Sequence, residues 1–133
     1  MLNLQSVNHI AIIASDYNRS LSFYTQILGM EVISEVWRPE RKSMMCRLAL
    51  NGEYLIELFT FPGSPPRPSY PESCGLRHLA FSVPDINDAV TMLERMQVPH
   101  EPVRTAPDGE LCCFFHDPDG LPIELVEKRN INA

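Results

Sequence analysis

An internal repeat constrains the fold of this chain more than any other feature of its 133 residues. His9 and His78 each open a similar apolar segment. A glutamate within an apolar stretch follows 48 residues after the first histidine, at Glu57, and 46 residues after the second, at Glu124. Self-similarity of this kind indicates that one supersecondary unit has been duplicated. We therefore expect two copies of one module, each with the same two polar residues.

Hydrophobic patterning predicts the order βαβββ in both copies. In the first copy, Asp16 is placed to cap a helix whose apolar residues recur at helical spacing until Gly29 ends it. In the second copy, Asp85 caps a helix that runs to about Met96. The Asn-Gly pair at 51–52 is a strong hairpin signal. The predicted strands cover residues 7–14, 31–37, 44–50, 54–60, 77–83, 100–104, 110–116 and 121–127.

A proline-rich segment separates the two copies. Five prolines fall within residues 62–71, which excludes a helix or a central strand there. We interpret residues 62–76 as a stiff, plain connector rather than as a lid that edges the site. The length of the chain predicts a single domain over residues 1–133, with modules at about 5–61 and 77–128.

Composition excludes several classes of protein. The net charge of −6 argues against a nucleic-acid or anionic-membrane partner. No apolar run approaches the roughly 20 residues that span a bilayer, and the N-terminal stretch lacks the features of a signal peptide, so we expect a cytoplasmic protein. Four cysteines in a chain of this length do not indicate a disulfide framework. We expect mostly buried, reduced thiols at Cys46, Cys74, Cys112 and Cys113.

Strand parity places the repeated polar residues, because side chains alternate between the two faces of a strand. His78 shares a face with the small residues Ala80 and Ser82, which leaves space beside the imidazole. Glu57 is flanked by apolar residues, and Tyr54 is predicted to point away from it. A carboxylate in such surroundings is costly to bury unless it is paired or bound to a metal.

Two imidazoles and two carboxylates at matched spacing therefore predict a divalent-metal site. A single strand histidine is more often a hydrogen-bonded core residue, and a single strand glutamate more often faces solvent or pairs with an arginine. The doubled pair favours the metal instead. Mixed imidazole and carboxylate ligands suit Ni, Co, Fe, Mn or Zn. His100 and His116 have no counterparts and are predicted to be structural or surface residues. The predicted ligands are His9, Glu57, His78 and Glu124.

The number of ligands bears on the chemistry. Four protein ligands on a six-coordinate ion leave two positions open, and adjacent open positions suit two neighbouring oxygens of one substrate. The metal would then act as a Lewis acid that stabilises an enediolate. A ring-cleaving dioxygenase needs three open positions, so the second carboxylate counts against that reaction.

The chain resembles the vicinal oxygen chelate superfamily, and most of all its glyoxalase I (lactoylglutathione lyase) branch. The motifs are the two histidine-opened strands and the segments 22–29, 55–58 and 117–125, so the resemblance covers nearly the whole chain. The connector and residues 74–83 resemble a bacterial glyoxalase-like subgroup. The resemblance implies an α+β fold in which tandem βαβββ modules form a curved mixed sheet around the metal, with helices on the outside.

The resemblance also implies roles for the four residues. The family's His/Glu/His/Glu ligand pattern maps onto His9, Glu57, His78 and Glu124. Glu124 would shift on the metal and act as the base that moves a proton between neighbouring carbons, with Glu57 as the partner acid or base. In many members the site is shared across a homodimer. We therefore expect a homodimer that acts on a small molecule such as a thiol adduct.

Two departures from the family pattern count against glutathione as the thiol. Glutathione-using members typically carry an arginine four residues after the first ligand and an asparagine four residues after the second. Here these positions are Ile13 and Phe61. Other basic residues could contact an anionic carrier instead, although a solvated basic loop is the alternative interpretation. These residues are Arg38, Arg41, Lys42, Arg47 and Arg67.

The leading functional hypothesis is a metal-dependent lyase or isomerase of glyoxalase I type, acting on a thiol adduct of a 2-oxoaldehyde or a similar substrate. One alternative is an acyl-CoA epimerase of the methylmalonyl-CoA type, although its first-module carboxylate is usually a glutamine. Another is a metal-dependent thiol transferase that inactivates an antibiotic. Such transferases resemble a His/His/Glu site with three protein ligands, so a bound Glu57 argues against this alternative. The non-enzyme alternative is a drug-sequestering protein, which generally lacks the ligand set.

Overall fold

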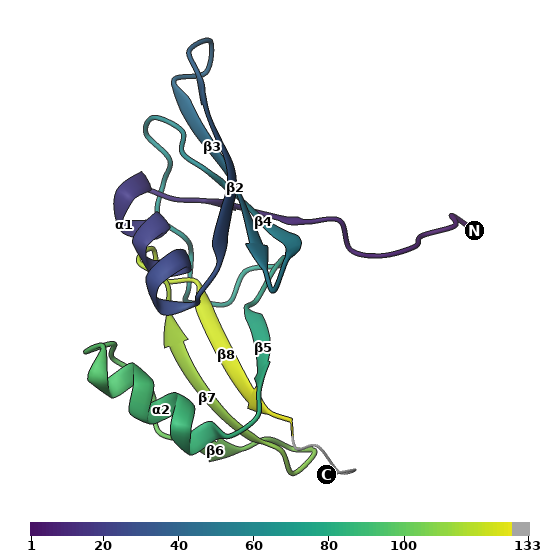
Figure 1. Ribbon diagram of the computed structural model, residues 1–133, viewed down its shortest axis with the longest axis vertical. Coiled ribbons are helices and arrows are strands. Elements are labelled where there is room, and N and C mark those ends of the chain that lie inside the picture. The colour runs from purple at the N-terminus through teal and green to yellow at the C-terminus, as the bar shows by residue number, and fades with distance from the viewer. Residues whose placement is uncertain (129–133) are drawn as a thin grey trace. The chain divides into compact units, whose positions relative to one another are not determined.

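Figure 1 shows the computed structural model, which describes residues 1–128. The chain divides into two compact units, the first ending at Pro66 and the second beginning at Arg67, inside the predicted connector. Each unit carries its own four-stranded mixed sheet. The α+β class and the order βαβββ in both copies are confirmed. That the two modules form a single domain stays a prediction.

In the first unit, the sheet has the order β1-β4-β3-β2, with β1 parallel to β4 and the other pairs antiparallel. The parallel pair is possible because the helical segment carries the chain from β1 to the far edge of the sheet, so that β1 and β4 meet as neighbours. The elements are β1 (Ile10–Ile13), α1 (Tyr17–Ser22), a π-helical segment η1 (Phe23–Ile27), β2 (Glu31–Arg38), β3 (Ser43–Leu50) and β4 (Glu53–Phe59).

Local chemistry sets the turns of this unit. Asp16 caps α1 as predicted, and its side chain accepts a hydrogen bond from the Arg19 amide. The single predicted helix is interrupted, because its second half winds as the π-helix η1, which the apolar spacing did not indicate. Asn51 and Gly52 both have positive φ, 51° and 83°, which is the backbone of a tight hairpin turn.

The second unit repeats this plan with the order β5-β8-β7-β6, and β5 is parallel to β8. Helix α2 lies along one face of this sheet (Figure 1). The predicted strand at 100–104 is mostly irregular: one bridge joins His100 to Phe115, and β6 has two residues. The elements are β5 (Leu79–Val83), α2 (Ile86–Arg95), β6 (Arg104–Thr105), β7 (Leu111–His116) and β8 (Pro122–Glu127).

Carboxylate side chains fix the start of α2 and the turn before β8 in the second unit. Asp85 caps α2 as predicted, and Glu127 accepts a hydrogen bond of 3.0 Å from the Ile86 amide. The Asp117 carboxylate accepts from the amides of Asp119 and Leu121 and so closes the turn between β7 and β8. These bonds hold α2 against β8 and set where β8 begins.

The core of each unit lies between its helical segment and one face of its sheet. Buried strand residues alternate with exposed ones, so the predicted faces of β1 and β5 are confirmed. The cysteines within residues 1–128 are all free thiols, and only Cys74 is exposed, as expected. The fully buried core residues include Tyr24, Leu48, Ile56 and Leu58 in the first unit, and Ile86, Phe115 and Ile123 in the second.

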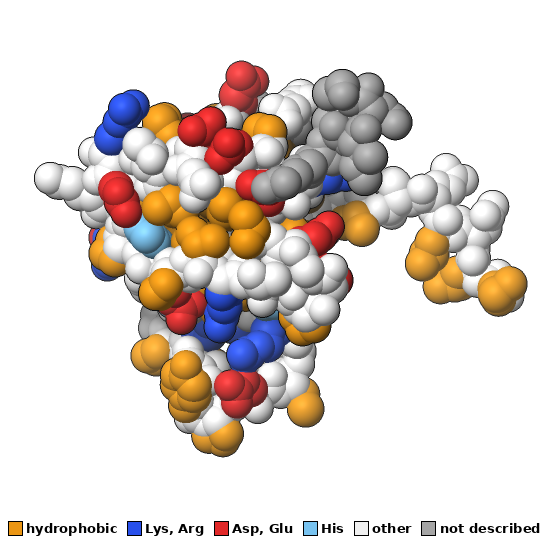
Figure 2. Space-filling view, turned by 90° about the horizontal axis from the view of Figure 1, so that it is seen from below, with side chains coloured by type: hydrophobic (Ala, Val, Ile, Leu, Met, Phe, Trp, Pro, Cys, Tyr) orange, Lys and Arg blue, Asp and Glu red, His pale blue; other side chains and the backbone are white. Residues whose placement is uncertain are grey.

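The helices described in residues 1–128 are too short or too polar to span a bilayer. On the face shown in Figure 2, acidic side chains are scattered among neutral ones, which accords with the net charge of −6. The cytoplasmic location stays a prediction.

Candidate metal centre

Parallel strand pairing brings each histidine to its glutamate. In both units the register partner of the glutamate is an alanine: Ala11 for Glu57, and Ala80 for Glu124. The histidine of the same unit stands two residues before that alanine, directly ahead of the first residue of the strand. The side chains of histidine and alanine therefore lie on the same side of the sheet as the glutamate.

The two pairs have almost the same geometry. Nε2 of His9 lies 3.5 Å from Oε1 of Glu57, and Nε2 of His78 lies 3.4 Å from Oε1 of Glu124. These separations exceed the roughly 2.7–3.2 Å of an N–H···O hydrogen bond. Two donors that each bind one ion at about 2.1 Å lie about 3.0 Å apart at a right angle and about 3.4 Å apart at the tetrahedral angle. Each pair is therefore spaced for two ligands of one ion, nearer the tetrahedral value than the right-angle value of a six-coordinate ion.

In the first unit, further side chains orient the pair. Nδ1 of His9 lies 2.6 Å from the amide oxygen of Asn8, which accepts a hydrogen bond from Nδ1–H in the tautomer that leaves the lone pair on Nε2. The His9 ring stacks on Tyr54, with centroids 5.1 Å apart. The Tyr54 hydroxyl donates to Oε2 of Glu57 at 3.1 Å, and Nε of Arg47 lies 3.6 Å from the same oxygen. Oε1 is thus left to face the histidine.

The position of Tyr54 corrects a prediction, because strict alternation placed it away from Glu57. A register shift between Leu48 and Ala49 leaves one residue of β4 unpaired, which turns Tyr54 onto the glutamate side. Burial, first, and then the hydrogen bond to Glu57 raise the pKa of the Tyr54 phenol. Tyr54 therefore remains a proton donor to the carboxylate, a role that the sequence pattern did not reveal.

In the second unit, an aromatic ring and a thiol adjoin the pair. The residue opposite Glu124 on the neighbouring strand is Phe114, and its ring stands edge-on to His78 with centroids 5.2 Å apart. The Cys112 thiol lies close enough to the Glu124 carboxylate to interact with it electrostatically. Burial, first, and then this carboxylate raise the pKa of Cys112, so the thiol stays neutral.

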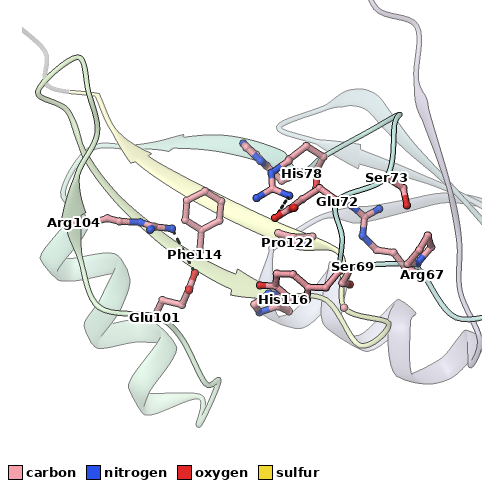
Figure 3. A pocket seen from close by; sticks show the side chains of 14 residues that line it. Arg67, Ser69, Glu72, Ser73, His78, Glu101, Arg104, Phe114, His116 and Pro122 are labelled. Atoms are coloured by element: carbon pink, nitrogen blue, oxygen red, sulfur yellow. Dashed lines mark hydrogen bonds and ion pairs between the residues drawn. The ribbon is translucent and has the colours of Figure 1, made fainter.

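A pocket of about 440 Å³ opens beside His78 within the second unit (Figure 3). Residues 67–70 and 72–73 of the connector form part of its wall, so the prediction of a plain connector is wrong for this stretch. His116, predicted to be a structural or surface residue, also lines the pocket together with Phe114. The connector therefore edges the space next to a predicted metal ligand.

Three of the basic residues predicted to contact an anion, Arg38, Arg41 and Arg67, have other partners. Arg38 and Arg41 lie over the Phe61 ring, with guanidinium carbons 5.7 and 4.8 Å from its centroid. Arg67 donates to the backbone carbonyls of Leu76 and Arg77, at 3.1 and 2.9 Å. Phe61 is thus covered by cations, whereas the other departure from the glutathione pattern, Ile13, is 53% exposed.

The structure thus brings the four predicted ligands together as two pairs, one in each unit. Neither unit by itself gathers three or more His, Cys, Asp or Glu side chains at one place within residues 1–128. That the two pairs share one ion therefore stays a prediction.

With this fold and these repeated pairs, the chain matches the Glyoxalase/Bleomycin resistance protein/Dioxygenase superfamily over residues 6–125. The chain belongs to that superfamily, as its sequence resemblance predicted. The crystal structure of a glyoxalase family protein from Enterococcus faecalis is similar, with a TM-score of 0.88 and 42% identity, covering 95% of this chain and 100% of that one.

Related sequences include one close and two distant proteins. The uncharacterized protein YaeR of Escherichia coli (strain K12) is 57% identical over 96% of this chain and 100% of its own length. The lactoylglutathione lyase of Salmonella typhimurium is 28% identical, covering 92% of each chain. The human mitochondrial methylmalonyl-CoA epimerase is also 28% identical, covering 94% of this chain and 75% of its own. Because both proteins are 28% identical to this chain, sequence identity alone does not favour the lyase over the epimerase.

Proposed function

We propose that this protein is a metal-dependent lyase or isomerase of glyoxalase I type. Its substrate would be a thiol adduct of a 2-oxoaldehyde or a similar molecule with two neighbouring oxygens. The observation that carries the proposal is the repeated His–Glu spacing of 3.5 and 3.4 Å, which suits ligands of a common ion in both copies. The ligands would be His9, Glu57, His78 and Glu124.

A bound divalent ion, Ni, Co, Zn, Mn or Fe, would supply Lewis-acid stabilisation of negative charge on the substrate oxygens. The residues of the chain would move the proton. Glu124 would take it from the carbon that bears one oxygen and return it to the neighbouring carbon, so the reaction needs no oxidant or reductant. The residue opposite Glu124 is the uncharged Phe114, so this carboxylate would be held less firmly than Glu57 and could change position during the reaction.

Glu57 has the surroundings of a fixed ligand. The Tyr54 hydroxyl and the Arg47 guanidinium both face its Oε2 atom, so this carboxylate is held in place. We therefore assign the moving base to Glu124, and to Glu57 the role of ligand and partner acid or base on the opposite side of the substrate.

Metal stoichiometry tests whether the pairs act together. The purified protein, reconstituted and then dialysed, should retain close to one divalent ion per chain by elemental analysis. His9→Ala and His78→Ala should each remove it, because each removes one ligand of the same ion. If either variant keeps its metal, or if two weakly held ions are found, the shared four-ligand site is wrong.

Turnover of defined substrates tests the reaction. The metal-loaded protein should convert methylglyoxal adducts of one or more low-molecular-weight thiols, and a proton-exchange assay on methylmalonyl-CoA serves as the comparison. Exchange on methylmalonyl-CoA without conversion of any adduct would favour the epimerase over the lyase. The proposed homodimer is tested in the same preparation by its mass in solution.

A further inference from the structure

We propose that the pocket beside His78 binds an oxyanion, a carboxylate or phosphate carried by the substrate, through Arg77 and Arg104. This deepens the proposed function, on which it rests, by naming the chemical class of the carrier. Both arginines line the pocket, and neither was among the basic residues that the sequence predicted to contact an anion.

The charges in the pocket favour an anion. Its lining contains three arginines and two glutamates, so its formal charge is +1 with neutral histidines (+3 − 2), whereas the whole chain carries −6. A metal ion held by His78 would add further positive charge. A positive concave site on an acidic protein attracts a small anion while the rest of the surface repels it.

Weak internal pairs leave the two arginines available to a ligand. Nη1 of Arg77 lies 3.5 Å from Glu72, and Nη2 of Arg104 lies 3.7 Å from Glu101, both longer than a hydrogen bond. The four side chains are between 51% and 65% exposed, and exposed pairs of this kind contribute only about 0–1 kcal/mol. An oxyanion with bidentate geometry can replace such a partner, because a guanidinium offers several donors.

The third arginine has a different role. Both contacts of Arg67 are hydrogen bonds to the carbonyls of Leu76 and Arg77, so it fastens the connector to the chain just before His78. This contact keeps the connector in place as the wall of the pocket. Arg67 is therefore a positioning residue for Arg77 rather than a ligand of the anion.

One aromatic ring links the anion site to the predicted metal ligand. The guanidinium carbon of Arg104 lies 4.9 Å from the centroid of Phe114, whose other neighbour is the His78 ring (Figure 3). The same substrate can therefore place its reacting oxygens near His78 and a charged group near Arg104. A short neutral thiol adduct would fill only the first position.

Direct binding of inorganic phosphate tests the site without turnover. Phosphate is added stepwise to the full-length protein, with and without bound zinc, while the Nε–H resonances of the arginine side chains are recorded by NMR. The signals of Arg77 and Arg104 should shift and saturate. Arg77→Gln and Arg104→Gln should each weaken binding about tenfold or more, because each removes a charge-assisted hydrogen-bond donor.

Arg95→Gln is the matched control, because Arg95 is an exposed arginine in α2 of the same unit and does not line the pocket. It should leave phosphate binding unchanged. Arg104→Lys keeps the charge without the planar donors and should retain more binding than Arg104→Gln. Equal effects of the pocket and control variants, or no saturable shift at Arg77 and Arg104, would overturn the proposal.

Kinetics then distinguish the carrier's chemistry. Methylglyoxal adducts of 2-mercaptoethanol, 3-mercaptopropionate and phosphopantetheine present no charge, a carboxylate and a phosphate. The better anionic adduct should show kcat/KM about tenfold or more above the neutral one, chiefly through KM, and the pocket variants should abolish this difference. Equal turnover of all adducts by every variant would sink the anion site and keep the lyase. Specific phosphate binding without any turnover would sink the lyase and keep the site.

Discussion

The two copies of the module hold the same His–Glu pair in opposite surroundings. Across the strand from Glu57 stands Arg47, and the equivalent position across from Glu124 is Phe114. Tyr54 adds a hydroxyl donor to the first carboxylate. Duplication has thus kept the two candidate ligands while the neighbouring side chains have diverged: a hydroxyl and a guanidinium adjoin the first carboxylate, and a phenyl ring and a thiol adjoin the second.

One part of this difference, the position of Tyr54, originates in backbone register. The unpaired residue in β4 turns Tyr54 towards Glu57, whereas β7 and β8 pair from His116 to Cys112 without a shift. The second unit also has the open pocket next to its histidine. We therefore propose that the first copy chiefly holds the metal, and that the second chiefly binds the substrate and transfers the proton.

The largest effects are expected when each of the two glutamates is replaced by glutamine, because these changes test the proposed difference between Glu57 and Glu124 directly. Glu124→Gln should lower kcat by about 10²–10⁴-fold, since the amide cannot accept the proton, while most of the metal is retained. Metal content by elemental analysis and kcat on the same preparation provide the measurement.

Glu57→Gln is the matched change in the other copy, and it should show the reverse balance. Loss of the held carboxylate should reduce metal affinity more than Glu124→Gln does, and activity should partly return at high metal concentration. If the two variants lose metal and rate in the same proportion, the copies are not specialised.

Tyr54→Phe should have a smaller effect, and on metal rather than on chemistry. The change removes the hydroxyl that donates to Oε2 of Glu57 but keeps the ring that stacks on His9. Loss of such an orienting hydrogen bond typically lowers metal affinity about 10–100-fold. Competition with a chelator gives the affinity. Tyr17→Phe, which removes a hydroxyl that donates to Glu35 in the same unit, should leave it unchanged.

Much of this arrangement could be predicted because the chain contains its own comparison. A single His9 or Glu57 would not distinguish a ligand from a core or surface residue, whereas a second pair at matched spacing favours the ligand interpretation. Parity along β5 then placed His78 on the face where the structure has it. The capping aspartates marked the starts of both helices for equally local reasons.

The features that were missed depend on structure beyond local pattern. One unpaired residue in β4 reverses the side to which Tyr54 points, and alternation alone carries no sign of it. Proline content predicted the stiffness of the connector but could not show that Arg67 would bond back to Leu76 and make it a wall. Arg104 reaches Phe114 only through the pairing of the two-residue strand β6.

The smallest effect is expected on stability, from the side-chain contacts made by Tyr17 at the helix of the first unit and by Glu94 at the helix of the second. In the first unit, the Tyr17 hydroxyl donates to Glu35, and burial, first, and then Glu35 raise the pKa of Tyr17, so this link keeps its proton near neutral pH. In the second, His100 lies between the Glu101 carbonyl, at 2.8 Å, and Glu94 of α2, at 3.3 Å. The bond to the carbonyl, first, and then Glu94 raise the pKa of His100, against the effect of burial.

A raised pKa in the folded state means that protonated His100 stabilises the fold. This contribution is fully present below the ordinary histidine pKa of about 6.5 and is lost as pH rises through the higher folded-state value. His100→Gln should therefore lower the free energy of unfolding by less than about 1 kcal/mol at acid pH, and by less still in mildly alkaline solution. Urea denaturation at the two pH values measures this difference. Glu94→Gln, which leaves the carbonyl contact, should reduce the pH dependence only in part. A His100→Gln effect that does not change with pH would show that the imidazole contributes packing rather than charge.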